Sequence, residues 1–227
     1  DAMASCAWAR FYDDDVTNAQ FIKEPNWQNA KPLDWIKMTM SGRYDMMPGW
    51  LWLIPKKIID RGGGWDDRLS LNNDFEFSIR LLSQSSSVLF CPDAKIYYRS
   101  GNSSTLSAIN SEPAYRAAIL SARLGCTQLL SKDNSASIQL LCANKYSYWL
   151  YRVYPYYPSL VKELEDEIKM LGGTNRKIDE SPLMHQLQNV LGWKAAKRIK
   201  MIMYKLGYER HLLSLKKRSF PPSISTR

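Results

Sequence analysis

The sequence predicts a mixed α/β fold over residues 1–110, followed by a mainly α-helical region over residues 111–227. In the first part, short apolar and aromatic runs alternate with turn residues, which is typical of an α/β domain. From Glu112 onward, apolar residues recur instead at the spacing of one helix face. With 227 residues and a hydrophobic fraction of 45%, the chain can bury one substantial core or two small ones, so we expect a globular protein.

A strand and a short helix are expected in the middle of the first part. Trp50–Ile54 is an aromatic and aliphatic run closed by Pro55, which predicts a buried strand. Residues 56–61 follow with about one and a half turns of helix. The three glycines Gly62–Gly64 then end this helix, because glycine tolerates the backbone conformation of a helix C-terminus.

A second helix and two short strands complete the first part. Asn72 and Asn73 are good N-cap residues, and apolar residues at helical spacing after them predict a helix over about 74–84. Residues 88–91 and 95–99 are predicted to form two short strands, joined by a turn that contains a proline.

The second part is predicted to contain helices over 112–130, 135–151, 159–171 and 193–208. A proline-rich break separates the second helix from the third, and Gly172–Gly173 ends the third. The last helix is amphipathic, with apolar residues on one side and lysines and arginines elsewhere.

The net charge of +9 is concentrated in this last region. A single acid, Glu209, faces nine basic residues there: Lys194, Lys197, Arg198, Lys200, Lys205, Arg210, Lys216, Lys217 and Arg218. A basic amphipathic helix of this kind is typical of attachment to an anionic membrane surface. We do not expect nucleic acid as a partner, because no nucleic-acid-binding motif accompanies the charge.

Cysteines and hydropathy indicate the compartment. The four cysteines form no C-x-x-C pair and have no histidine close by, so neither a disulfide framework nor a zinc site is indicated. His185 and His211 likewise have no partner in the sequence that indicates metal or triad chemistry. No apolar run reaches the roughly 18 to 20 residues of a membrane-spanning helix. We therefore expect a cytoplasmic protein, peripheral at the inner face of the cell membrane.

The most informative stretch for chemistry runs from Gly62 to Arg80, where a glycine loop leads to a carboxylate, Asp74, at a helix start. The free N–H groups of a helix N-terminus stabilise an anion, and glycines allow a substrate to approach the backbone. A carboxylate placed in this way can act as a general base. An aspartate at a helix start is also often a simple cap, so the pattern alone leaves both interpretations open.

The same stretch resembles the late motif of family 2 glycosyltransferases. The residues that carry the resemblance are Gly64, Trp65, Asp66–Asp67, Leu69–Ser70–Leu71, Asn73–Asp74 and Arg80. Three flanking groups are also similar to that family: Cys6–Phe11 and Trp50–Pro55 upstream, and Phe90–Ser100 with Ser104–Ser107 downstream. The resemblance covers about residues 2–107 and implies an incomplete GT-A domain followed by a helical tail.

The resemblance implies an inverting transferase that moves a sugar from a nucleotide-sugar donor to a glycan or lipid-linked acceptor of the cell envelope. Asp74 would be the catalytic base, and Asn73 departs from the acidic residue usual before it. The implied substrate-binding residues are Trp65, Asp66, Asn73, Trp50 and Arg99. Core packing is an alternative role for the tryptophans, a surface position for Arg99, and an ordinary helix salt bridge with Glu76 for Arg80.

The family's nucleotide site and its metal-binding Asp-x-Asp belong to the first half of the fold. We expect the complete enzyme to use a divalent metal, Mg or Mn, with ligands that are not in this chain, and we read Asp13–Asp15 as a solvated turn. The chain begins inside an apolar stretch, so we expect a fragment without the nucleotide-binding half, inactive alone. The alternative is a noncatalytic helical module that binds the membrane surface through its basic C-terminal helix.

Overall fold

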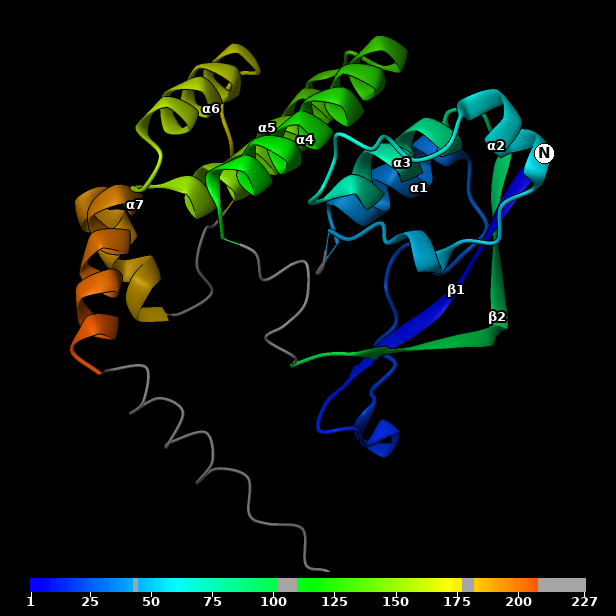
Figure 1. Ribbon diagram of the computed structural model, residues 1–227, viewed down its shortest axis with the longest axis horizontal. Coiled ribbons are helices and arrows are strands. Elements are labelled where there is room, and N and C mark those ends of the chain that lie inside the picture. Colours follow the sequence, from blue (N-terminus) through cyan, green and yellow to red (C-terminus); the bar gives the residue numbers. More distant parts are fainter. Residues whose placement is uncertain (43–44, 102–109, 177–181, 208–227) are drawn as a thin grey trace, which may run out of the picture. The chain divides into compact units, whose positions relative to one another are not determined.

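The structure, a computed structural model, describes residues 1–42, 45–101, 110–176 and 182–207 (Figure 1). These residues form a mixed α/β protein with a small parallel sheet and several helices, which confirms the predicted fold class at this level. Asp1–Arg176 make one compact unit and Lys177–Arg227 a second. The predicted domain boundary at residue 110 stays a prediction.

The sheet of the first unit has two parallel strands, β1 (Ala2–Phe11) and β2 (Ser87–Arg99), which lie side by side in Figure 1. The register shifts once: Cys6 pairs with Cys91, but the next residue, Ala7, pairs with Lys95. Residues 92–94 therefore bulge out of the ladder, as expected where proline supplies no N–H donor. The two strands predicted over 88–91 and 95–99 are one strand with a bulge in place of the turn.

The strand predicted over Trp50–Ile54 is wrong. Gly49–Leu51 form a short 3-10 helix, η2, and only Leu53 makes an isolated antiparallel bridge, to Ala4 of β1. The N–H of Leu51 bonds to the carbonyl of Pro48, which closes the tight turn. The N–H of Leu53 bonds to the carbonyl of Ala4, which is the isolated bridge and does not extend into a ladder.

Three helices surround the core of the α/β part: α1 (Pro32–Met40), α2 (Lys56–Gly62) and α3 (Asn73–Leu82). Helices α2 and α3 were predicted, whereas α1 was not. The core of this part is formed by fully buried side chains from these helices and from the two strands: Met3, Trp35, Ile58, Ile79, Leu81, Leu82 and Val88.

Three longer helices follow in the same unit, α4 (Glu112–Lys132), α5 (Ala136–Val153) and α6 (Pro158–Met170), close to the predicted ranges. Helix α4 packs against α3, α5 against α4, and α6 against α5 (Figure 1). At Gly125 of α4, a Cβ atom would lie 2.5 Å from Cε1 of Phe75. The glycine therefore lets α3 and α4 approach closely, which brings the helical part onto the start of α3.

The second unit contains α7 (Pro182–Lys205), which is broken at Gly192, where φ is 77°. The predicted helix begins just after this break, and the turns before it were missed. Among the helices in the described ranges, none is both long and apolar enough to cross a bilayer. Some predicted features lie outside the described residues: Ser104–Ser107, Arg210, His211, Lys216, Lys217 and Arg218.

Candidate functional site

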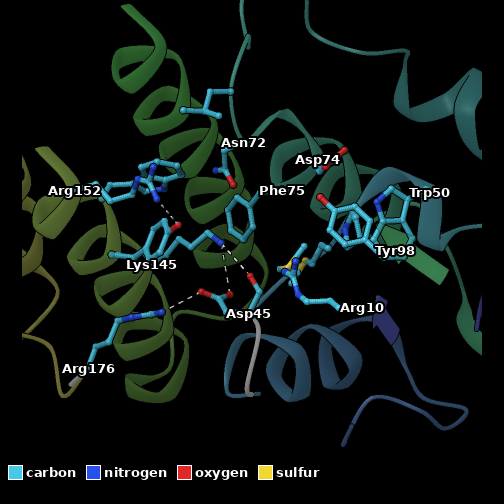
Figure 2. Close-up of a pocket in the computed structure, with 16 residues that line it drawn as sticks. Arg10, Asp45, Trp50, Asn72, Asp74, Phe75, Tyr98, Lys145, Arg152 and Arg176 are labelled. Atoms are coloured by element: carbon cyan, nitrogen blue, oxygen red, sulfur yellow. Dashed lines mark hydrogen bonds and ion pairs between the residues drawn. The ribbon is translucent and has the colours of Figure 1, made fainter. Parts of the chain in front are cut away.

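A cavity of about 510 Å³ opens in the first unit (Figure 2). Arg10 and Tyr98 line it from near the carboxyl ends of β1 and β2. The other walls come from the segment 45–50, the start of α3 and one face of α5. In α/β proteins ligands bind beyond the carboxyl ends of parallel strands, and the volume is in the range of small-molecule sites.

Asp74, the predicted base, lies in the wall of this cavity, in the first turn of α3. Its Oδ1 accepts a hydrogen bond of 3.1 Å from the backbone N–H of Gly49. Burial raises the pKa of the Asp74 carboxyl above its ordinary value, and the Gly49 bond opposes this only in part. Desolvation therefore outweighs the stabilisation expected at a helix start, which makes the carboxylate a stronger base.

Gly49 also brings Trp65 next to this carboxylate. A Cβ atom on Gly49 would lie 2.8 Å from Cη2 of Trp65 and 3.1 Å from Oδ1 of Asp74. The Trp65 ring stacks on Phe77, with 3.8 Å between centroids and 11° between planes. Trp65 is 47% exposed and lies beside Asp74 across the glycine, outside the cavity wall itself.

Trp50 is part of the cavity wall and stacks on Tyr98, with centroids 5.1 Å apart and planes at 22°. The guanidinium of Arg10 lies 5.1 Å from the Tyr98 ring centroid and donates to Ser100 Oγ at 2.9 Å. Trp52 instead packs on Trp35 in the core. Trp50 therefore lies in the cavity wall, whereas Trp52 packs in the core, which is the alternative role that the sequence left open for the tryptophans.

Arg80 holds the glycine loop in place. It forms the predicted salt bridge with Glu76, at 2.6 and 3.0 Å, and also donates to the carbonyls of Gly62, Gly63 and Gly64. This second set of bonds was not predicted. Three successive glycines have no side chains to shield their carbonyls, so a nearby arginine can donate to all three. A glycine triplet is therefore the sequence feature that could have predicted these bonds.

The remaining predicted residues lie at different distances from the cavity. Asn73 adjoins Asp74, since its Oδ1 accepts from the Asp74 N–H at 3.0 Å. Asp66 is tied to Arg68 by bonds of 2.6 to 3.2 Å, which hold its pKa at about 2. Arg99 is exposed and pairs with Asp14 at 3.2 Å. Of the predicted site residues, Trp50 and Asp74 line the cavity. Asn73 and Trp65 lie beside Asp74 outside the wall, and Asp66 and Arg99 also lie outside it.

Helix α5 supplies a wall that was not predicted. Lys145, Tyr148, Trp149 and Arg152 line the cavity at positions i, i+3, i+4 and i+7 of the helix. Residues at this spacing share one helix face. In the sequence, a lysine and an arginine two turns apart flank two aromatic residues on the same helix face, and this pattern could have predicted a cationic binding surface.

A metal does not fit the carboxylates described here. In the turn Asp13–Asp15, which was predicted to be solvated and is exposed, Asp15 accepts from the N–H and hydroxyl of Thr17, and Asp14 pairs with Arg99. Across the described ranges, no three His, Cys, Asp or Glu side chains are grouped to hold an ion. Within the part of the chain that the structure describes, the cavity wall has two carboxylates, those of Asp45 and Asp74.

No protein-family model, no curated protein and no solved structure matches this chain.

Proposed function

We propose that this chain is the C-terminal part of an inverting family 2 glycosyltransferase with a GT-A fold, and that Asp74 is its general base. One observation carries the proposal: a half-buried carboxylate with a raised pKa lies in a cavity wall that also contains the stacked pair Trp50 and Tyr98. The motif resemblance of residues 62–80 supports the same assignment.

In the proposed reaction an acceptor hydroxyl attacks the anomeric carbon of the donor sugar. Asp74 takes the hydroxyl proton while the new carbon–oxygen bond forms and the bond to the nucleoside diphosphate breaks, with its electron pair leaving on the diphosphate. Gly49 fixes Oδ1 of Asp74, so Oδ2 is the oxygen suited to accept the proton. Trp50 and Tyr98 offer flat apolar faces for a sugar ring, and Trp65 lies beside the base.

The test uses this chain joined to its upstream coding sequence and a panel of nucleotide sugars labelled in the sugar. Transfer of label to a cell-envelope fraction is expected for the unmodified protein. Asp74→Asn should slow this transfer by at least roughly 10²-fold. The matched variant Asp60→Asn should keep it, because Asp60 is exposed and pairs with Lys56 on α2. No transfer from any donor, or equal transfer by both variants, would contradict the proposal.

We also propose that α7 attaches the protein to an anionic membrane surface. Val190, Leu191, Ile202 and Leu206 are 51% to 82% exposed, in a segment rich in lysine. Apolar side chains next to basic ones are what an interfacial helix inserts among lipid headgroups. The same surface would serve a noncatalytic module, so it does not depend on the enzymatic proposal.

Flotation with vesicles of phosphatidylglycerol and phosphatidylcholine tests this attachment. The double variant Ile202→Glu and Leu206→Glu should stay with the unbound protein, because carboxylates replace the apolar contacts. Met170→Glu is the matched control, since Met170 is 78% exposed but lies on α6. Equal flotation of both variants would overturn the assignment to α7.

A further inference from the structure

The cavity has two chemically different sides (Figure 2). Asp74, Trp50 and Tyr98 lie on one side, and Lys145 and Arg152 of α5 on the other, with the Phe75 ring between them. The side formed by α5 is cationic and lies outside the segment that carries the glycosyltransferase resemblance.

Lys145 is a buried ammonium that is poorly neutralised. Its side chain is 6% exposed, and its Nζ lies 3.5 Å from Oδ1 and 3.4 Å from the carbonyl oxygen of Asp45. Both distances exceed those of a strong charge-assisted hydrogen bond. Its Nζ also lies over the Phe75 ring, 4.3 Å from the centroid. Asp45 is shared with Arg176, at 3.3 Å, so one carboxylate serves two cations.

Two buried donors beside Lys145 have no acceptor. Nε of Arg152 and Nε1 of Trp149 are both buried, and no described group accepts a hydrogen bond from either. Arg152 makes one side-chain bond, a 3.3 Å contact from Nη1 to the hydroxyl of Tyr148. Buried N–H groups are nearly always paired, and both residues line the cavity, so a ligand that reaches these donors as the side chains move can supply the missing acceptor.

The charge of the whole wall leads to the same conclusion. Among the described residues, four cationic side chains line the cavity against two carboxylates, Asp45 and Asp74. Arginine and lysine around a concave surface are the usual binding groups for phosphate, through several short charge-assisted bonds.

We propose that the α5 side of the cavity binds a phosphate or diphosphate group carried by the sugar acceptor. Anion binding itself follows from the unpaired donors and the charge of the wall. Its assignment to the acceptor rests on the proposed function, in which Asp74 faces the acceptor hydroxyl. Both sides belong to one cavity of about 510 Å³, so a single phosphorylated sugar can place its ring by Trp50 and its phosphate by Lys145 and Arg152.

Titration of the chain with inorganic pyrophosphate tests the anion site, with tryptophan fluorescence as the signal because Trp50 and Trp149 line the cavity. The unmodified chain should bind, and Arg152→Gln and Lys145→Met should each weaken binding by at least roughly tenfold. Arg116→Gln, which removes an exposed arginine paired with Glu112 on α4, should bind as before. Equal affinity in all four proteins, or no binding by the unmodified chain, would overturn the proposal.

Arg152→Gln keeps the test decisive if Lys145→Met fails to fold, because Arg152 is only half-buried and makes one long bond. Asp74→Asn should bind pyrophosphate at least as tightly as the unmodified chain. If the transfer assay shows that Asp74 is not the base, the anion site is unaffected. If pyrophosphate does not bind, the proposed role of Asp74 is unaffected.

The source of the anion is tested by the kinetics of the complete enzyme. Arg152→Gln should raise the KM for the acceptor by at least roughly tenfold and leave the KM for the nucleotide sugar unchanged. A raised KM for the nucleotide sugar, with the acceptor unaffected, would assign the site to the donor diphosphate and overturn the proposal.

Discussion

At the scale of single residues, Asp74 couples the proposed chemistry to stability. Burial raises its pKa above the ordinary 3.8, so the folded state binds a proton more readily than the unfolded state. Stability from this group is therefore present at low pH and is lost as the pH rises through the raised pKa. An ionised Asp74 at pH 7 destabilises the fold, as is common for functional groups.

Asp74→Asn should consequently melt at a higher temperature than the unmodified chain at pH 7. The asparagine can still accept the Gly49 N–H bond but carries no charge to desolvate. The difference in Tm should shrink as the pH falls toward 3.8, where the aspartate is also becoming protonated. Calorimetry from about pH 4 to about pH 7 measures this trend, and a lower Tm of the variant at neutral pH would contradict it.

Arg80 is the second residue with a large expected effect. Its side chain pairs with Glu76, whose side chain is 9% exposed, and it also bonds to the glycine loop. Arg80→Met leaves a buried carboxylate without its cation and releases three carbonyls, so we expect a loss of about 3 kcal/mol in the free energy of unfolding.

Urea denaturation measures the Arg80 effect. The matched control is Arg116→Met, which breaks an exposed pair of the same spacing with Glu112 and should change stability by less than about 0.5 kcal/mol. Similar losses for the two variants would show that the glycine loop does not depend on Arg80.

At the scale of elements, the contact between α3 and α4 depends on Gly125. Alanine there gains about 1 kcal/mol in helix propensity but places Cβ 2.5 Å from Phe75. Overpacking of a close helix contact costs about 1 to 3 kcal/mol, so we expect a net loss of about 1 kcal/mol.

A double-mutant cycle with Phe75→Leu checks the origin of this loss. The smaller side chain removes the clash, so Gly125→Ala should cost less in the Phe75→Leu background than in the unmodified chain, by urea denaturation. Equal costs in the two backgrounds would place the strain elsewhere.

Elements with local signals could be predicted from the sequence. Helices α4, α5 and α6 begin after clear breaks and carry apolar residues at helical spacing, so their ranges agree closely with the predictions. The segment Trp50–Ile54 has the composition of a strand but forms none. It begins within a 3-10 turn closed by the Leu51 N–H and the Pro48 carbonyl, and Gly49 of that turn bonds to Asp74, 25 residues away. Periodicity cannot reveal such a contact.

At the scale of the whole molecule, the candidate site combines parts that lie far apart in the sequence. Asp74 and Trp50, which the resemblance predicts as site residues, both line the cavity. Lys145 and Arg152 could not be joined to the same site, since only the packing of α5 through α4 onto α3 brings them to the cavity. The boundary predicted near residue 110 falls between the wall that contains Asp74 and Trp50 and the wall formed by α5. Both walls belong to one compact unit, Asp1–Arg176.

In the proposed mechanism Asp74 takes a proton from an acceptor bound in this cavity. The most direct test is the pH dependence of kcat/KM for sugar transfer by the complete enzyme and by Asp74→Asn. The unmodified enzyme should lose activity as the pH falls through a pKa above 3.8, and the variant should be slower by roughly 10²- to 10⁴-fold and lack this acid limb. A variant that stays within roughly tenfold of the unmodified enzyme and keeps the same acid limb would show that Asp74 is not the general base.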